Sequence, residues 1–139
     1  MRPDHYALLY EFLNWAGDQT PIAGIALVGN CASDEDNEEQ SDMNFLIISD
    51  KKAKTLEAIL NQFPFDRVEE ATKDERGSLL SLRILYANGL EAEYGIVEET
   101  WFNEPLDETL KEVLMRGFKV IWEREELFNP ITEFISRHK

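Results

Sequence analysis

The stretch from Ile22 to Asp50 constrains the fold more than any other part of this sequence. Two short apolar runs, at 25–28 and 45–48, are joined by a polar and strongly acidic segment, and Gly29 directly follows the first run. Short apolar runs that are bounded by turn residues are typical of buried β-strands. We therefore expect two neighbouring strands here with a long polar connection between them.

The second of these strands begins with polar residues. Side chains alternate between the two faces of a strand, so Asp42 and Asn44 are predicted on one face and Met43 and Phe45 on the other. If the apolar pair faces the core, the polar pair lies on the opposite side. The sequence thus predicts a polar patch at the start of a buried strand.

A hairpin is the clearest local signal later in the chain. The dipeptide Asn88-Gly89 separates two strand-like runs, 79–87 and 90–97. Asn-Gly favours a type I′ turn, because both residues tolerate a positive φ. In the second run Glu91 and Glu93 share one face and the apolar residues share the other. Two carboxylates are therefore expected on one side of this strand.

These polar positions occur in an order that is found in a known family. Gly29 and Asn30 come after the first strand, Asp42 and Asn44 open the second, and Glu93 lies on a later strand. The order resembles that of the nucleotidyltransferase superfamily of the polymerase-beta type, small bacterial members included, with a degenerate motif. That family has Gly-Ser or Gly-Gly after one strand and Asp-x-Asp or Asp-x-Glu entering the next. A third carboxylate follows on a later strand.

The resemblance implies a fold and a chemistry. The fold is α/β (α+β), a mixed β-sheet with helices packed on it. Asp42, Asn44 and Glu93 would hold Mg²⁺, or alternatively Mn²⁺, while Gly29 and Asn30 would bind a nucleoside triphosphate. An NMP unit would then pass to an unknown acceptor, either a small molecule or a protein side chain.

Two departures from the family pattern leave alternatives open. Asn44 stands where the family has a second acid, and Asn30 stands where it has Ser or Gly. A neutral ligand weakens a metal site, so a second hypothesis is a catalytically degenerate binding or regulatory module with the same fold. A third hypothesis is an unrelated mixed α/β interaction protein. Lys73, Arg76 and Arg83 are cations that could contact a polyphosphate, or else be solvated.

The composition of the chain argues against two classes of binding partner, nucleic acids and membranes. The chain has 139 residues, which suits one domain over 1–139, and its formal net charge of −14 opposes binding to polymer nucleic acid. Cys31 is the single cysteine, so no intrachain disulfide is expected. No segment is apolar and long enough for a signal peptide or a membrane span, which predicts a cytoplasmic protein without membrane partners. The acidic segment 34–40 is interpreted as a solvated loop, with a collector of divalent cations as the alternative, and the oligomeric state stays open.

Periodicity predicts the remaining elements. Helix 5–16 is expected to form an apolar stripe of Tyr6, Leu9, Tyr10 and Leu13, with Phe12 as a further candidate, and His5 is expected on the surface. The other expected elements are a helix capped by Ser49 or Asp50 and running to Phe63, a weak strand 65–70, a turn-like segment 72–77, a helix from Leu106 or Asp107 to about Gly117, a strand 118–122 and a helix 127–135.

Overall fold

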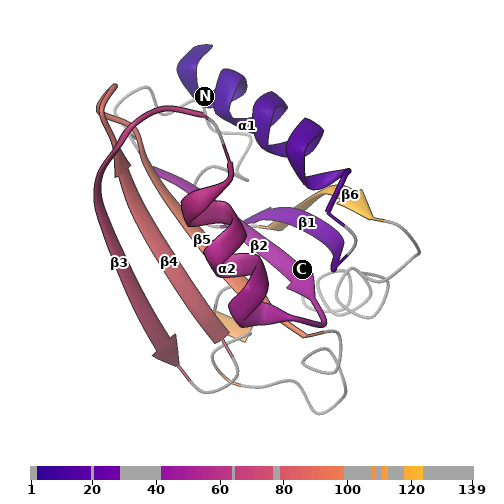
Figure 1. Cartoon of the computed structure of the whole chain (residues 1–139). Helices are drawn as coiled ribbons and strands as arrows, with labels where there is room; N and C mark the ends of the chain where they lie inside the picture. The colour runs from indigo at the N-terminus through magenta and orange to yellow at the C-terminus, as the bar shows by residue number, and fades with distance from the viewer. Residues whose placement is uncertain are drawn as a thin grey trace.

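The computed structural model describes residues 3–19, 21–28, 42–63, 65–76, 79–98, 108, 111–112 and 118–123. Within these residues, a six-stranded sheet carries two helices on one face (Figure 1). The elements in chain order are α1 (Pro3–Ala16), β1 (Ile22–Val28), β2 (Asp42–Ser49), α2 (Lys52–Asn61), β3 (Val68–Arg76), β4 (Leu79–Tyr86), β5 (Glu91–Val97) and β6 (Phe118–Glu123). Neither helix is long and apolar enough to span a membrane.

The sheet is mixed, as the sequence predicted. Its strand order is β3-β4-β5-β2-β1-β6, and the central β2–β5 pair is parallel while every other neighbouring pair is antiparallel. In the parallel pair Asp42 lies opposite Glu91, and Asn44 lies opposite Glu93. Residues that are paired in this way point to the same face. The predicted polar positions of two distant segments therefore meet on neighbouring strands.

The core lies between the sheet and the two helices. Phe12 of α1 lies at its centre, with ring centroids 4.9 Å from Phe45, 5.2 Å from Phe63 and 5.2 Å from Tyr94. Met43 and Phe45 are buried on this face, as predicted from strand alternation. Asn44 on β2 and Glu91 and Glu93 on β5 consequently face away from the helices.

The buried face of α1 matches the predicted stripe only in part, because Phe12 is buried and Leu9 and Leu13 pack against the core as partly buried residues. The buried residues are His5, Leu8, Phe12 and Ala16, whereas Tyr6 and Tyr10 are 48% and 68% exposed. Both sets recur at helical spacing, so periodicity alone does not choose between them. Packing against the sheet selects the set that carries Phe12. The prediction of a solvated His5 was wrong for the same reason.

The hairpin between β4 and β5 is confirmed, but its turn is not type I′. Gly89 has φ 90°, while no described residue other than glycine has a positive φ. The Gly89 amide donates to the Tyr86 carbonyl, the Tyr86 amide donates to the Leu90 carbonyl, and the Leu90 amide donates to the Asn88 side chain at 3.0 Å. This pattern is that of a three-residue loop with glycine in the left-handed position.

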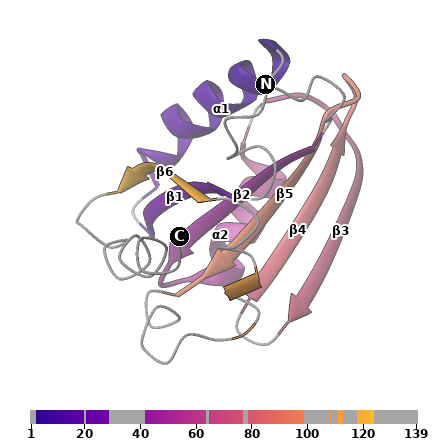
Figure 2. The same ribbon diagram turned by 180° about the vertical axis from the view of Figure 1, so that it is seen from behind.

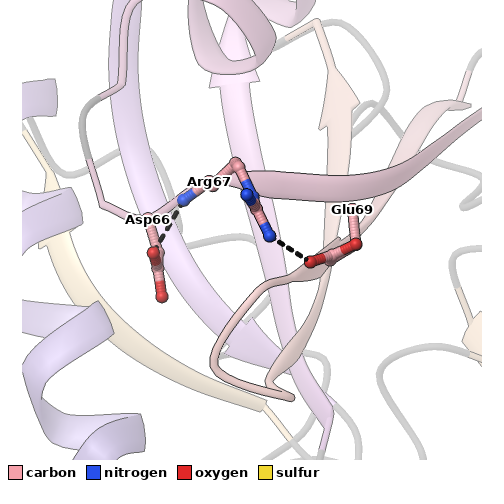
Figure 3. Close-up of polar contacts among 3 residues, drawn as sticks. All are labelled: Asp66, Arg67 and Glu69. Carbon is pink, nitrogen blue, oxygen red and sulfur yellow. Dashed lines mark hydrogen bonds and ion pairs between the residues drawn. The ribbon is translucent and has the colours of Figure 1, made fainter.

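Strand β3 was only partly predicted. It runs through the segment 72–76 that was expected to form a turn, and it pairs with β4 along its whole length as the edge of the sheet. At its start the Arg67 amide donates to Asp66 and the Arg67 guanidinium pairs with Glu69 (Figure 3). An edge strand with polar residues on both faces lacks the apolar alternation by which strands are recognised.

The start of α2 also differs from expectation. Lys51 is the N-cap residue and makes no side-chain capping bond. The Ser49 hydroxyl instead accepts from the Lys51 amide at 3.1 Å and bonds the Thr55 hydroxyl at 2.7 Å. Strand β6 is confirmed, whereas most of the helix expected up to 117 and all of the helix 127–135 lie outside the described residues.

Candidate functional site

Polar side chains gather on the sheet face opposite the helices, where β2 and β5 begin. This face is seen in Figure 2. We call Asn44, Ser81, Arg83, Glu91 and Glu93 the polar cluster; they come from β2, β4 and β5. Strand register brings them together, since Asn44 pairs with Glu93 on one side and Arg83 pairs with Glu93 on the other. Asn44, Glu91 and Glu93 are half-buried there.

Glu93 is the centre of the polar cluster. One of its carboxylate oxygens accepts from the Ser81 hydroxyl at 2.9 Å, and the other pairs with the Arg83 guanidinium at 3.1 Å. The Glu93 side chain is 27% exposed and that of Arg83 is 55% exposed. The carboxylate is thus held by a hydroxyl and by a permanently charged group, both of which come from β4.

The same face changes character along the strands. Beyond the polar cluster, Leu46, Ile48 and Val97 are buried, with exposures of at most 2%. Polar residues therefore occupy the N-terminal ends of the parallel pair, and apolar residues occupy its C-terminal ends. The end of β1 lies beside this polar end, because Leu27 pairs with Phe45.

Of the five predicted site residues, Asn44 and Glu93 are brought together. The structure does not describe the side chains of the other three. Asn44 and Glu93 are neighbours in the sheet. The backbone of Asp42 lies in β2 opposite Glu91, but its side chain is outside the described set. Gly29 and Asn30 lie outside the described residues altogether. Their nucleotide-binding role stays a prediction.

Ser81 was missed by sequence reasoning, although a signal for it exists. On β4, Ser81 and Arg83 interrupt an otherwise apolar run at alternate positions, which places them on one face. A two-residue Asn88-Gly89 turn would set Arg83 opposite Tyr94. The three-residue loop that forms instead shifts the register by one residue and sets Arg83 opposite Glu93.

The described side chains do not form a centre for two divalent cations. Magnesium prefers several hard, anionic oxygen ligands. Glu93 already binds Arg83, and Asn44 is neutral. Among the described side chains, no three His, Cys, Asp or Glu residues lie close enough together to hold a metal ion. A cation arriving at Glu93 would have to compete with the guanidinium.

Comparisons with known proteins support the fold. No protein-family model matches the sequence, and a search of curated proteins gave no match. Among solved structures, the chain is similar to an aminoglycoside 6-adenyltransferase from Bacillus subtilis, with a TM-score of 0.53 and 14% sequence identity. The similarity covers 87% of this chain but 41% of that one, so the chain spans less than half of its neighbour's length. At this identity the similarity shows the fold, and the predicted nucleotidyltransferase-like fold is confirmed.

Proposed function

We propose that this chain is a nucleotidyltransferase-fold domain that binds a nucleoside triphosphate beside the polar cluster as a binding or regulatory module. The ion pair between Arg83 and Glu93 is the observation that carries the proposal. It puts a guanidinium on the carboxylate that the family resemblance assigns to a metal.

Nucleotidyl transfer needs strong compensation of negative charge. Two divalent cations roughly 4 Å apart usually supply it, and a cluster of carboxylates holds them. Here the neutral Asn44 occupies the position of the second acid, and the charge of Glu93 is compensated by its ion pair with Arg83. Both differences lower the affinity for a second cation. They leave a site that is better suited to holding a polyphosphate than to activating it.

Arg83 is suited to phosphate binding. A guanidinium forms paired hydrogen bonds with phosphate oxygens and stays charged at all physiological pH values. Its side chain is more than half exposed, so it can reach a ligand beside the polar cluster while remaining near Glu93. In this proposal, Arg83 and Asn44 contact the triphosphate together with the Gly29-Asn30 segment, and a cation enters with the nucleotide near Asp42.

A second candidate function is retained because one observation favours it. Asn44 lies directly opposite Glu93 on the parallel pair, which is the arrangement that the motif predicts for an active site. In this case Asp42, Asn44 and Glu93 would hold Mg²⁺ or Mn²⁺, and an NMP unit would pass to a small-molecule or protein acceptor. Arg83 would then oppose metal binding rather than assist nucleotide binding.

The substitution Arg83→Gln separates the two functions. For a binding module we expect about a tenfold loss of affinity for ATP with Mg²⁺ in calorimetry, because a charge-assisted contact is removed. We also expect no release of pyrophosphate from any of the four nucleoside triphosphates. For a transferase, the same substitution frees Glu93 and should raise both the affinity for Mg²⁺ and the release of pyrophosphate.

Arg67→Gln is the matched control. Arg67 also pairs with a glutamate, Glu69, but at the exposed start of β3 (Figure 3). The control changes the net charge by the same amount and should leave ATP binding unaltered. Equal losses in both variants would mean that overall charge, and not contact with Arg83, governs binding. Absence of ATP binding by the unmodified protein with Mg²⁺ would overturn both functions.

A further inference from the structure

A cavity of about 460 Å³ lies on the helix-covered side of the sheet, away from the polar cluster. It is lined by the C-terminal end of α1, by the residues that follow it and by α2. Trp15 and Ile22 give it apolar walls, and Thr55 is a buried residue at its base. Its volume falls in the range of roughly 300–1,000 Å³ that is typical of small-molecule sites.

The rim of this cavity carries balanced charge. Asp18, Asp50, Lys51 and Lys54 all line it, and all four are exposed. Within the part of the chain that the structure describes, none of the four forms an ion pair. Two cations and two anions are therefore available to a ligand at one opening.

A fifth charged residue on the rim is already engaged. Glu57 pairs with Lys73 through one oxygen and accepts from the Asn61 amide through the other. The hydrogen bond from Lys73 lowers the pKa of Glu57 below its usual value. Glu57 thus contributes little net field to the cavity, and the unpaired charges of the rim sum to zero.

We propose that this cavity binds a small zwitterion, an α-amino acid with a flat apolar side chain. Its carboxylate would lie at Lys51 and Lys54, its ammonium group at Asp18 and Asp50, and its side chain against Trp15. A plain anion would meet Asp18 and Asp50 at this opening, and a plain cation would meet Lys51 and Lys54. A ligand with both charges meets both requirements. None of these residues belongs to the polar cluster, so the proposal does not rest on the proposed function.

The test uses L-phenylalanine and two analogues that each lack one charge. Phenylalanine amide lacks the carboxylate, and 3-phenylpropionate lacks the ammonium group. Amide chemical shifts are followed by NMR while each compound is added. We expect phenylalanine to shift the amides of residues 15–19 and 51–58 with a dissociation constant on the order of millimolar, and each analogue to bind at least about fivefold more weakly.

Variants locate the site. Lys54→Gln and Asp18→Asn should each weaken phenylalanine binding about fivefold, which corresponds to the loss of one exposed charge contact. Lys119→Gln, which alters an exposed lysine on β6, should not change binding. The proposal is overturned if phenylalanine gives no saturable shifts, if all three compounds bind equally, or if the shifts fall on β2 and β5. Equal weakening by Lys119→Gln would also overturn it.

Discussion

Asn44 is the neutral residue on the β2 side of the polar cluster. It lies opposite Glu93 on the central parallel pair, and it is an amide where the resembling family has an acid. An amide oxygen can accept a hydrogen bond or bind a cation weakly, but it adds no negative charge beside Glu93. A single substitution therefore tests whether this position was ever suited to a metal.

We expect Asn44→Asp to lower the free energy of unfolding in a chelator by about 0.5–1 kcal/mol, because like charges then lie directly opposite on neighbouring strands. Added Mg²⁺ should restore this loss if the acids hold a cation. Urea unfolding with and without Mg²⁺ measures both effects. Pyrophosphate release from the same variant shows whether an added carboxylate also restores transfer.

Asn88→Asp provides the control for charge. Its aspartate can still accept from the Leu90 amide in the hairpin turn, and it lies away from the polar cluster. Mg²⁺ should affect it no more than the unmodified protein. A destabilised Asn44→Asp variant that Mg²⁺ does not rescue would exclude position 44 as a metal ligand.

The position of Glu93 could be predicted from its own strand, but its partners could not. Alternation along β5 correctly placed Glu91 and Glu93 on the face opposite Ala92 and Tyr94. It could not show that Arg83 neutralises Glu93, because that contact depends on the register of two strands. Register in turn depends on one residue of loop length.

At the scale of elements, the β4–β5 hairpin encloses a buried pair of hydroxyl groups. The Tyr86 and Tyr94 oxygens lie 2.8 Å apart on the helix-covered face, and both side chains are buried. Burial raises the pKa of Tyr86 to about 12. The pKa of Tyr94 is raised well above its usual value, mainly by burial and to a smaller extent by the charge that Tyr86 carries when ionised. The folded state therefore holds both protons more tightly than the unfolded state does.

This pair makes stability depend on alkaline pH. The stabilisation is complete below about pH 10, where unfolded tyrosine titrates, and is lost as the pH rises toward the folded value of about 12. We expect the free energy of unfolding to fall by on the order of 2 kcal/mol over this interval. Urea unfolding between pH 8 and 11.5 measures it.

Tyr86→Phe should reduce this dependence, whereas Tyr10→Phe, at an exposed position of α1, should not. At pH 7 Tyr86→Phe should also cost about 1–3 kcal/mol, because the Tyr94 hydroxyl loses its partner. The double variant with Tyr94→Phe should cost less than the sum of the two single ones. An unchanged alkaline slope in Tyr86→Phe would contradict the assignment.

Elements with a strong local signal were predicted, and elements defined by packing were not. The hairpin has its signal in adjacent residues, and β1, β2 and β6 have compact apolar runs. The buried face of α1 depends on which of two periodic stripes meets the sheet. Strand β3 depends on pairing with β4, since its own residues 69–75 are exposed. Neither the buried face of α1 nor the formation of β3 can be deduced from the residues of that segment alone.

At the scale of the whole molecule, excess negative charge opposes compaction. The formal net charge is −14 at pH 7. Salt shortens the range of this repulsion, since the Debye length falls from about 30 Å at 0.01 M to about 10 Å at 0.1 M. We expect the melting temperature to rise by a few degrees between 0.01 M and 0.3 M salt.

Sodium and potassium chloride should act equally if screening is the cause. A larger effect of one cation, or a lower melting temperature in salt, would contradict this explanation.

Duplex DNA and RNA should show no measurable binding to this protein at 0.15 M salt, because the dominant attraction to phosphate backbones requires a basic surface.

The overall class of fold was accessible from the sequence, while the chemistry of the site was only outlined. The mixed sheet with helices on it is confirmed, and Asn44 lies opposite Glu93 in the parallel pair. The single domain, the cytoplasmic location and the nucleotide-binding roles of Gly29 and Asn30 stay predictions. The geometry of the described residues tests neither the single domain nor the location, and Gly29 and Asn30 lie outside those residues.

The parallel pair β2–β5 has a consequence for how the site comes into being. It is a seam between two antiparallel units, β1-β2 and β3-β4-β5, and the strands of each unit are consecutive in the chain. The paired residues of the seam are roughly fifty positions apart in the chain, so their meeting closes a long loop and is expected to be a late event in folding. Asn44 and Glu93 lie on opposite sides of this seam. The polar cluster is thus assembled in the step that joins the two units, and a ligand that bridges Asn44 and Glu93 would slow their separation during unfolding.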